Sequence, residues 1–119
     1  MTSPAPGYVI GYLENVDVGP EILEYIERIE DTFEPYGGHW LVHNMPHVNH
    51  EGNLKGNVII IGFPSVDAAR EWFDSEAYQE IAPLRTEHAD SIVLSVEGVP
   101  RGYRGADTTA KMRSALSAS

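Results

Sequence analysis

The sequence contains no cysteine, and this absence removes several kinds of chemistry at once. Disulfide bonds, thiolate nucleophiles and cysteine-ligated metal centres are all excluded. No apolar run approaches the roughly 20 residues that a membrane-spanning helix needs. Residues 1–7 carry neither a basic segment nor an apolar signal region. We therefore expect a cytoplasmic protein with no membrane partner.

Basic residues are scarce except near the end of the chain. The 119 residues carry a formal net charge of −10 at pH 7. Residues 1–98 hold 17 acidic and 4 basic side chains, whereas residues 99–119 hold 1 acidic and 4 basic ones. An acidic body repels phosphate backbones, so we expect no nucleic-acid partner.

The motifs that bind common cofactors are also missing. There is no glycine-rich phosphate loop, no dinucleotide fingerprint, no GxSxG elbow and no carboxylate-rich calcium loop. We therefore expect no cofactor. Residues 1–7 are predicted to be disordered and residues 100–119 to form a flexible or arm-like tail, since the tail lacks apolar periodicity. One domain over residues 8–99 remains.

Strand and helix patterns alternate through that domain. Alternating patterns predict strands over residues 8–13, 39–45 and 91–97, and a run that is apolar on both faces predicts a further strand over residues 57–63. An apolar stripe predicts a first helix over residues 20–36, formed by Ile22, Ile26, Ile29, Phe33 and Tyr36. Ser65 is a candidate N-cap for a second helix, and Pro83 is expected to interrupt the helical stretch that follows. The order βαββαβ indicates an α+β, ferredoxin-like fold with a four-stranded antiparallel sheet.

Two helices can cover only one face of such a sheet. The third and last strands, however, are apolar on both faces, as Ile59 and Ile60 illustrate for the third strand. A sheet with two apolar faces needs a second cover. We therefore expect a homodimer that pairs through the uncovered face.

A specific succession of motifs carries a family resemblance. These are Tyr36-Gly37-Gly38, the strand and turn over residues 58–65, Ala68-Ala69, Trp72-Phe73-Asp74-Ser75 with Tyr78, Arg85, and the strand over residues 92–98. Over about residues 8–99 the chain resembles the domain of unknown function 1330 family. The resemblance implies two helices on one face of the sheet and pairing into a dimeric α+β barrel, but no reaction.

The chain departs from that family at two positions. Members usually carry a basic residue near the position of His39, and a glutamate where this chain has Gly62. The departures imply a barrel interior that is less charged, and roomier near Gly62. Within such a pocket we predict His39 and His43 as proton-transfer groups, since imidazole titrates near neutral pH. The alternative is a histidine bonded to a carbonyl or to the dimer partner.

Four histidines fall within twelve residues, which raises the question of a metal. On a straight strand His39 and His43 share a face but lie about 13 Å apart, too far for one ion. We therefore assign no metal ligands. A histidine-based metal-binding protein remains an alternative, with candidate ligands His39, His43, His47, His50 and Glu51.

Three further residues are candidates for substrate binding. Tyr12 offers a hydroxyl donor, Gly62 offers space, and Arg85 offers a fork that can hold a carboxylate. Ordinary packing of Tyr12 is the alternative. The alternative for Arg85 is an ion pair with Glu80, Glu87 or Asp90.

The leading hypothesis is a small protein that binds an organic metabolite in a barrel pocket. By analogy of fold it could be a cofactor-independent acid/base enzyme of the isomerase, cyclase or decarboxylase type. The alternative is a non-catalytic binding or structural homodimer. An open cavity with a histidine pointing into it would favour the enzyme, and a filled interior would favour the structural protein.

Overall fold

The four strands form one antiparallel sheet in the order β2-β3-β1-β4. The computed structural model describes residues 5–118. The strands are β1 (Gly7–Glu14), β2 (His39–Val42), β3 (Asn57–Phe63) and β4 (Asp90–Glu97). The order and the antiparallel pairing confirm the α+β, ferredoxin-like fold predicted from the sequence. β2 is shorter than the predicted strand over residues 39–45.

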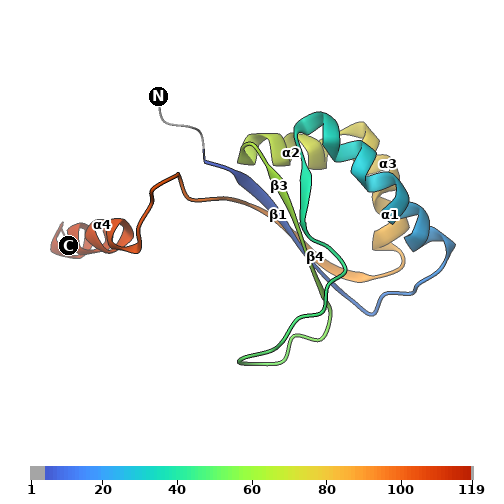
Figure 1. Ribbon diagram of the computed structural model, residues 1–119, viewed down its shortest axis with the longest axis horizontal. Helices are drawn as coiled ribbons and strands as arrows, with labels where there is room; N and C mark the ends of the chain where they lie inside the picture. The colour runs from blue at the N-terminus through green and yellow to red at the C-terminus, as the bar shows by residue number, and fades with distance from the viewer. Residues whose placement is uncertain (1–4, 119) are drawn as a thin grey trace.

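Three helices gather on one side of the sheet (Figure 1). They are α1 (Pro20–Phe33), followed by the short 3-10 turn η1 (Glu34–Tyr36), then α2 (Val66–Asp74) and α3 (Glu76–Thr86). Ser65 caps α2, because its hydroxyl accepts a hydrogen bond from the Ala68 N–H at 3.1 Å. The N-cap predicted at Ser65 is therefore confirmed.

The second half of the helical layer differs from its prediction. Ser75 separates α2 from α3 and caps α3 by accepting a hydrogen bond from the Tyr78 N–H. The predicted interruption at Pro83 is wrong, since Pro83 lies inside α3. Pro83 has no backbone N–H, so the Gln79 carbonyl oxygen lacks its usual helical hydrogen bond. Because Pro83 is exposed, water can donate to that carbonyl oxygen instead.

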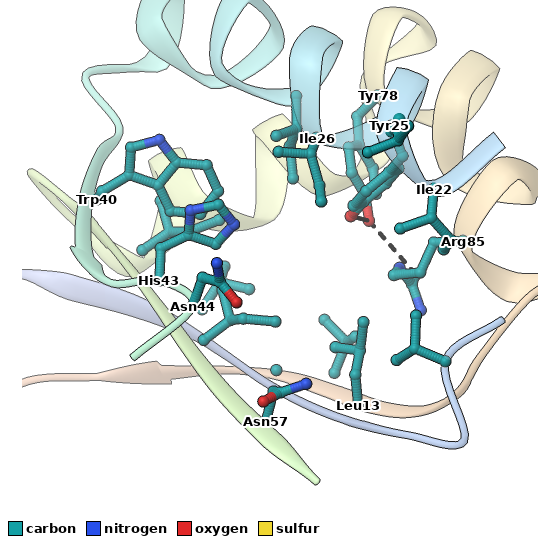
Figure 2. A pocket seen from close by; sticks show the side chains of 18 of the residues that line it. Leu13, Ile22, Tyr25, Ile26, Trp40, His43, Asn44, Asn57, Tyr78 and Arg85 are labelled. Atoms are coloured by element: carbon teal, nitrogen blue, oxygen red, sulfur yellow. Dashed lines mark hydrogen bonds between the residues drawn. The ribbon is translucent and has the colours of Figure 1, made fainter. Parts of the chain in front are cut away.

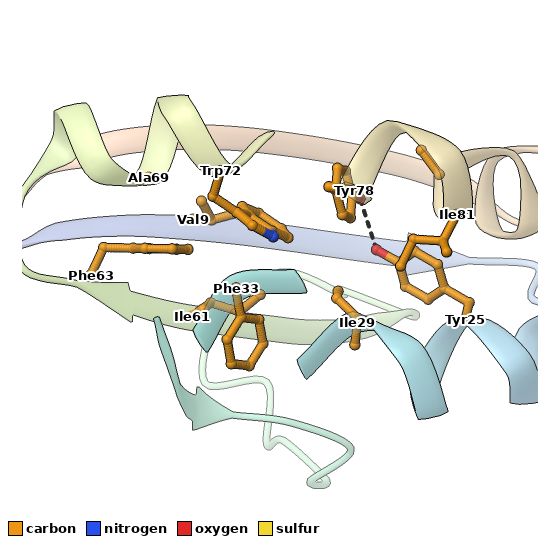
Figure 3. Close-up of a cluster of buried hydrophobic side chains, with 11 residues drawn as sticks. Val9, Tyr25, Ile29, Phe33, Ile61, Phe63, Ala69, Trp72, Tyr78 and Ile81 are labelled. Carbon is orange, nitrogen blue, oxygen red and sulfur yellow. Dashed lines mark hydrogen bonds between the residues drawn. The ribbon is translucent and has the colours of Figure 1, made fainter. Parts of the chain in front are cut away.

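Large aromatic side chains fill the space between helices and sheet (Figure 3). Phe33, Phe63, Trp72 and Tyr78 are all buried. Their rings meet at centroid distances of 4.3 to 6.5 Å. The indole N–H of Trp72 donates to the Thr32 hydroxyl at 2.9 Å, so this buried polar group is satisfied.

The opposite face of the sheet has no cover within the described chain. The expected alternation is confirmed: Val9 faces the helices, while Ile10 lies on the other face. On the uncovered face of β4, the exposed fractions are 62% for Ile92, 45% for Leu94 and 42% for Val96. A row of apolar side chains this exposed is unusual for a solvated sheet.

The C-terminal segment forms a helix of its own. This helix, α4 (Gly105–Ala118), is exposed along its whole length and stands apart from the other helices in Figure 1. At the other end β1 already begins at Gly7, within the segment predicted to be disordered, and residues 1–4 of that segment lie outside the described residues. None of the described helices is long and apolar enough to cross a membrane.

Candidate functional site

A cavity of about 370 Å³ lies between α1 and the helix-covered face of the sheet. A pocket was predicted in the barrel interior, which the uncovered face would line, so the observed cavity is on the opposite face. Figure 2 shows the side chains that surround it. The strands supply Val9, Gly11, Leu13, Ile59, Ile61 and Val93, and α1 supplies Ile22, Leu23, Tyr25, Ile26 and Ile29.

Gly11 contributes to the hollow by having no side chain. It lies on β1 between Val9 and Leu13, on the face that lines the cavity. A Cβ at Gly11 would come no closer than 3.7 Å to another atom, the distance of an ordinary van der Waals contact. The backbone there therefore does not require glycine, and a side chain at this position would occupy free space.

Arg85 forms one polar end of the cavity. It lies in the last turn of α3, and only 5% of its surface is exposed. Its guanidinium donates to the Ser91 hydroxyl and, at 3.3 Å, to the Tyr78 hydroxyl, and it lies 5.8 Å from the centre of the Tyr25 ring. Burial by itself would lower the pKa of Arg85. The hydroxyls of Tyr78 and Tyr25 favour the charged form, however, and the net pKa lies above its usual value.

The two tyrosines beside Arg85 are joined to each other. The hydroxyl oxygens of Tyr25 and Tyr78 lie 2.8 Å apart. Burial and the neighbouring Tyr78 raise the pKa of Tyr25 far above its usual value, so its hydroxyl remains protonated. This end of the cavity therefore combines a fixed positive charge with neutral hydroxyl groups.

His43 forms the other polar end. The pairing of β2 with β3 shifts register between Trp40 and Val42, so that Leu41 bulges out of the ladder. The bulge turns His43 onto the same face as Trp40, and the two rings stack with centroids 4.0 Å apart. His39, by contrast, pairs with Gly62 on the uncovered face. The shared face expected for His39 and His43 is therefore wrong.

The chemistry of His43 is set by its partial burial. Burial lowers the pKa of the imidazole, and the Glu30 carboxylate only partly opposes the shift. His43 is therefore neutral at pH 7. Neither of its ring nitrogens has a hydrogen-bond partner among residues 5–118. A neutral imidazole with a free nitrogen can accept a proton from a ligand.

Trp40 connects His43 to α1. Its indole N–H donates to a Glu30 carboxylate oxygen at 2.8 Å. This bond fixes the indole, and the indole in turn supports the His43 ring from one side. Asn44 follows with φ of 56°, a left-handed conformation that asparagine tolerates well, and the chain turns away from the cavity there.

Three of the predicted site residues lie away from this cavity. The Tyr12 hydroxyl accepts a hydrogen bond from the Gly56 N–H at 3.0 Å, which holds the end of the β2–β3 loop. The space expected at Gly62 is taken by His39, whose ring would lie 2.9 Å from a Cβ at that position. Of the five predicted residues, the cavity brings together only His43 and Arg85.

Sequence reasoning missed several residues of the site. The predicted stripe of α1 ran through Ile26, which is 42% exposed, and omitted Tyr25, which is buried. Residues 22, 25 and 29 follow steps of three and four, and residues 22, 26 and 29 follow steps of four and three. Both spacings fit one face of a helix, so periodicity alone could not choose between Tyr25 and Ile26. For Trp40 and Glu30 the sequence contained no comparable signal.

The histidine cluster is dispersed in the fold. His47 bonds the Leu54 carbonyl oxygen at 2.7 Å, which keeps it within the β2–β3 loop. Among residues 5–118 no three histidine, aspartate or glutamate side chains are arranged to hold a metal ion. The metal-binding alternative therefore gains no support from the described part of the chain.

Comparison with solved structures places this fold among known proteins. A protein of unknown function from Rhodopseudomonas palustris is 20% identical with a TM-score of 0.60, over 82% of this chain and 85% of that one. SnoaB, a cofactor-independent oxygenase from Streptomyces nogalater, is 15% identical with a TM-score of 0.57, over 84% and 99%. A dimeric ferredoxin-like protein of unknown function from Thermobifida fusca is 11% identical with a TM-score of 0.54, over 82% and 94%. At these identities the likeness shows the fold alone.

The sequence itself matches one family model. The family is described as a domain of unknown function (DUF1330), and the match covers residues 6–99. No curated protein matches the chain. The matched range includes both polar ends of the cavity.

Proposed function

Because the chain belongs to the DUF1330 family, for which the description gives no activity, we propose a function from the geometry of its cavity. The protein binds a small organic metabolite beneath α1 and transfers a proton to or from it through His43, without a cofactor. The single observation that carries the proposal is a neutral imidazole with free nitrogens at the edge of an open apolar cavity.

The size and lining of the cavity support a ligand site. Small-molecule pockets typically enclose about 300 to 1,000 Å³ and place a few polar groups among apolar walls. This cavity encloses about 370 Å³, with His43 at one end and Arg85 at the other. The alternative hypothesis of a structural homodimer predicts an interior filled by side chains. The open cavity therefore favours ligand binding over a purely structural role.

The reaction class follows from what a neutral imidazole can do. His43 would remove a proton from a carbon next to a carbonyl group, which gives an imidazolium and an enolate. Return of that proton to a different atom isomerises the ligand, and attack of the enolate carbon on a second carbonyl closes a ring. In a decarboxylation, the carbanion left by loss of CO₂ would take a proton from the imidazolium form of His43, which then recovers a proton from water. SnoaB, which shares the fold, is described as a cofactor-independent oxygenase, and by analogy it supports catalysis without a cofactor on this fold.

A cavity-filling variant tests the binding step. Gly11→Leu is expected to abolish binding of small carbonyl compounds that the wild-type protein binds, because the new side chain enters the cavity. Binding is measured by ligand-observed NMR with a panel of such compounds, alongside native mass spectrometry for a co-purified molecule. Ile10→Leu, on the other face of the same strand, is the control and retains binding. A panel in which no compound distinguishes wild type from Gly11→Leu would overturn the proposal.

We further propose that a second copy of the chain covers the uncovered face of the sheet. The exposed apolar side chains of β4 support this arrangement, as does the neighbour described as a dimeric ferredoxin-like protein. An interface of this kind is the same patch on both subunits, so one substitution acts twice.

A charge on that face tests the dimer. Leu94→Glu is expected to weaken dimerisation tenfold or more, because each interface would bury two unpaired carboxylates. Sedimentation or light scattering over a dilution series measures the effect. Val48→Glu places the same charge on the exposed β2–β3 loop and leaves the dimer intact. Leu94→Glu protein with the wild-type mass at every concentration would contradict the proposed interface.

A further inference from the structure

A buried positive charge without a counter-ion marks the Arg85 end of the cavity. Only 5% of Arg85 is exposed, yet no carboxylate among residues 5–118 lies within ion-pair distance of its guanidinium. Two of the three acidic partners expected from the sequence are engaged elsewhere. A carboxylate oxygen of Glu80 lies 3.9 Å from a guanidinium nitrogen of Arg28. A carboxylate oxygen of Asp90 accepts a hydrogen bond from the Asn15 side-chain amide at 2.9 Å.

The protein groups around this guanidinium are neutral and leave it incompletely bonded. It donates to the hydroxyls of Ser91 and Tyr78, and the Tyr25 hydroxyl also interacts with it. The Nε of Arg85 is buried and has no acceptor among the described residues. Removing a charge from water without a counter-charge is costly, and buried arginines in proteins are normally paired. An anion bound at this place would supply the counter-charge that residues 5–118 do not provide.

The neighbouring tyrosines add a second donor. Tyr25 and Tyr78 together carry two hydroxyl hydrogens, and their mutual bond uses one of them. The second hydrogen has no described acceptor, while the Tyr78 oxygen already receives a bond from Arg85. Burial and the neighbouring Tyr78 raise the pKa of Tyr25, so the Tyr25 hydroxyl keeps its hydrogen. Arg85, Tyr25 and Tyr78 all line the cavity, so a ligand group there can meet a guanidinium, which is a donor only, beside hydroxyl groups that can also donate.

We infer that this end of the cavity binds the carboxylate of an organic acid whose apolar body extends toward Trp40 and His43. The inference rests on the proposed function, since it takes the cavity to be a ligand site. A carboxylate has two acceptor oxygens, no donor and one negative charge, which match one guanidinium fork and a hydroxyl. The strongly acidic body of the chain disfavours ligands of higher negative charge, such as phosphate esters.

Matched ligand pairs test this inference. The probes are 3-phenylpropanoate with 3-phenylpropanamide, and hexanoate with hexanamide, which differ within each pair only in the charged group. In the wild-type protein the carboxylate is expected to bind at least tenfold more tightly than the amide, as measured by calorimetry or ligand-observed NMR. In Arg85→Met the preference is expected to fall to within twofold, because the carboxylate loses its counter-charge and so loses more affinity than the amide.

Two controls separate the charge of Arg85 from other effects. Arg28→Met removes an exposed arginine that pairs with Glu24 on α1, and it retains the preference for the carboxylate. If Arg85→Met does not fold, the wild-type protein still decides the question. The Arg85 Nε–H resonance is expected to shift when the carboxylate is added and to stay in place when the amide is added.

Each remaining outcome has a defined meaning. Amides that bind as tightly as carboxylates, or a preference that survives Arg85→Met, overturn the carboxylate subsite and leave the proposed function standing. If no member of either pair binds the wild-type protein, the proposal of a carboxylate subsite is wrong. If, in addition, Gly11→Leu and wild type bind the panel of small carbonyl compounds equally, the proposed function is wrong as well.

Discussion

Replacement of His43 by glutamine is expected to lower proton transfer to a bound ligand by about 10²–10⁴-fold, the usual contribution of a positioned general base. Glutamine keeps a polar side chain of similar size but cannot take up a proton. The reaction to follow is deuterium exchange in D₂O at C3 of 2-oxo-4-phenylbutanoate. This probe has an acidic C–H next to a carbonyl, an apolar body and a carboxylate.

The pH dependence of that exchange follows from the environment of His43. Burial lowers the pKa of the imidazole below its ordinary value of 6.5, and Glu30 raises it in part. Only the neutral imidazole is a base, so the rate rises with pH up to the lowered pKa and is constant at neutral pH. Glu30→Gln removes the carboxylate charge that raises the pKa of His43, so the inflection of the pH–rate profile is expected to move to lower pH.

His39 provides the matched control for this experiment. It is the other histidine of β2, but it lies beside Gly62 on the uncovered face, away from the cavity. His39→Gln is expected to retain the wild-type exchange rate as long as its dimer mass is unchanged. A His43→Gln rate within tenfold of wild type would contradict the role of His43. Equal losses in both variants would point to a general loss of structure.

The contrast between these two histidines shows where sequence reasoning succeeds. On β1 and β3 the expected alternation of the two faces holds, because a regular strand turns successive residues to opposite faces. On β2 the same rule failed, since the bulge at Leu41 adds one residue and reverses the faces after it. Nothing in the alternation of residues 39–43 encodes that register shift.

Arg85 illustrates a second limit. Its residue type alone predicted a carboxylate anchor, while its surroundings could not be predicted because they come from distant parts of the chain. Tyr25 lies 60 positions before Arg85 and reaches it only because α1 packs against α3. Whether Tyr25 or an acidic residue near α3 would meet the guanidinium depends on that packing. That no carboxylate of residues 5–118 pairs with Arg85 is therefore visible only in the fold.

The stability of the fold is expected to depend strongly on Gly7, at the start of β1. A Cβ at Gly7 would lie 2.4 Å from the backbone carbonyl of Ser65 and from the backbone nitrogen of Val66, where α2 begins. Backbone atoms cannot rotate away as a side chain can, so alanine would push α2 off the sheet. Overpacking of a buried site costs about 1–3 kcal/mol and occasionally more, and we expect Gly7→Ala to lose about 3 kcal/mol or more.

Gly11→Ala separates this steric demand from the open space of the cavity. Gly11 lies on the same strand and the same face as Gly7, but its added Cβ would make only ordinary contacts, with Ile59 and Leu13 at 3.7 Å. The free energy of unfolding is expected to change by less than about 1 kcal/mol, with a small gain because glycine is unfavourable inside a strand. Urea denaturation measures both variants, and Gly7→Ala lowers the midpoint without changing the slope. Equal losses of unfolding free energy would mean that β1 requires glycine at both positions. The expected difference would mean that Gly7 is needed for the packing of α2 on the sheet, whereas Gly11 leaves space in the cavity.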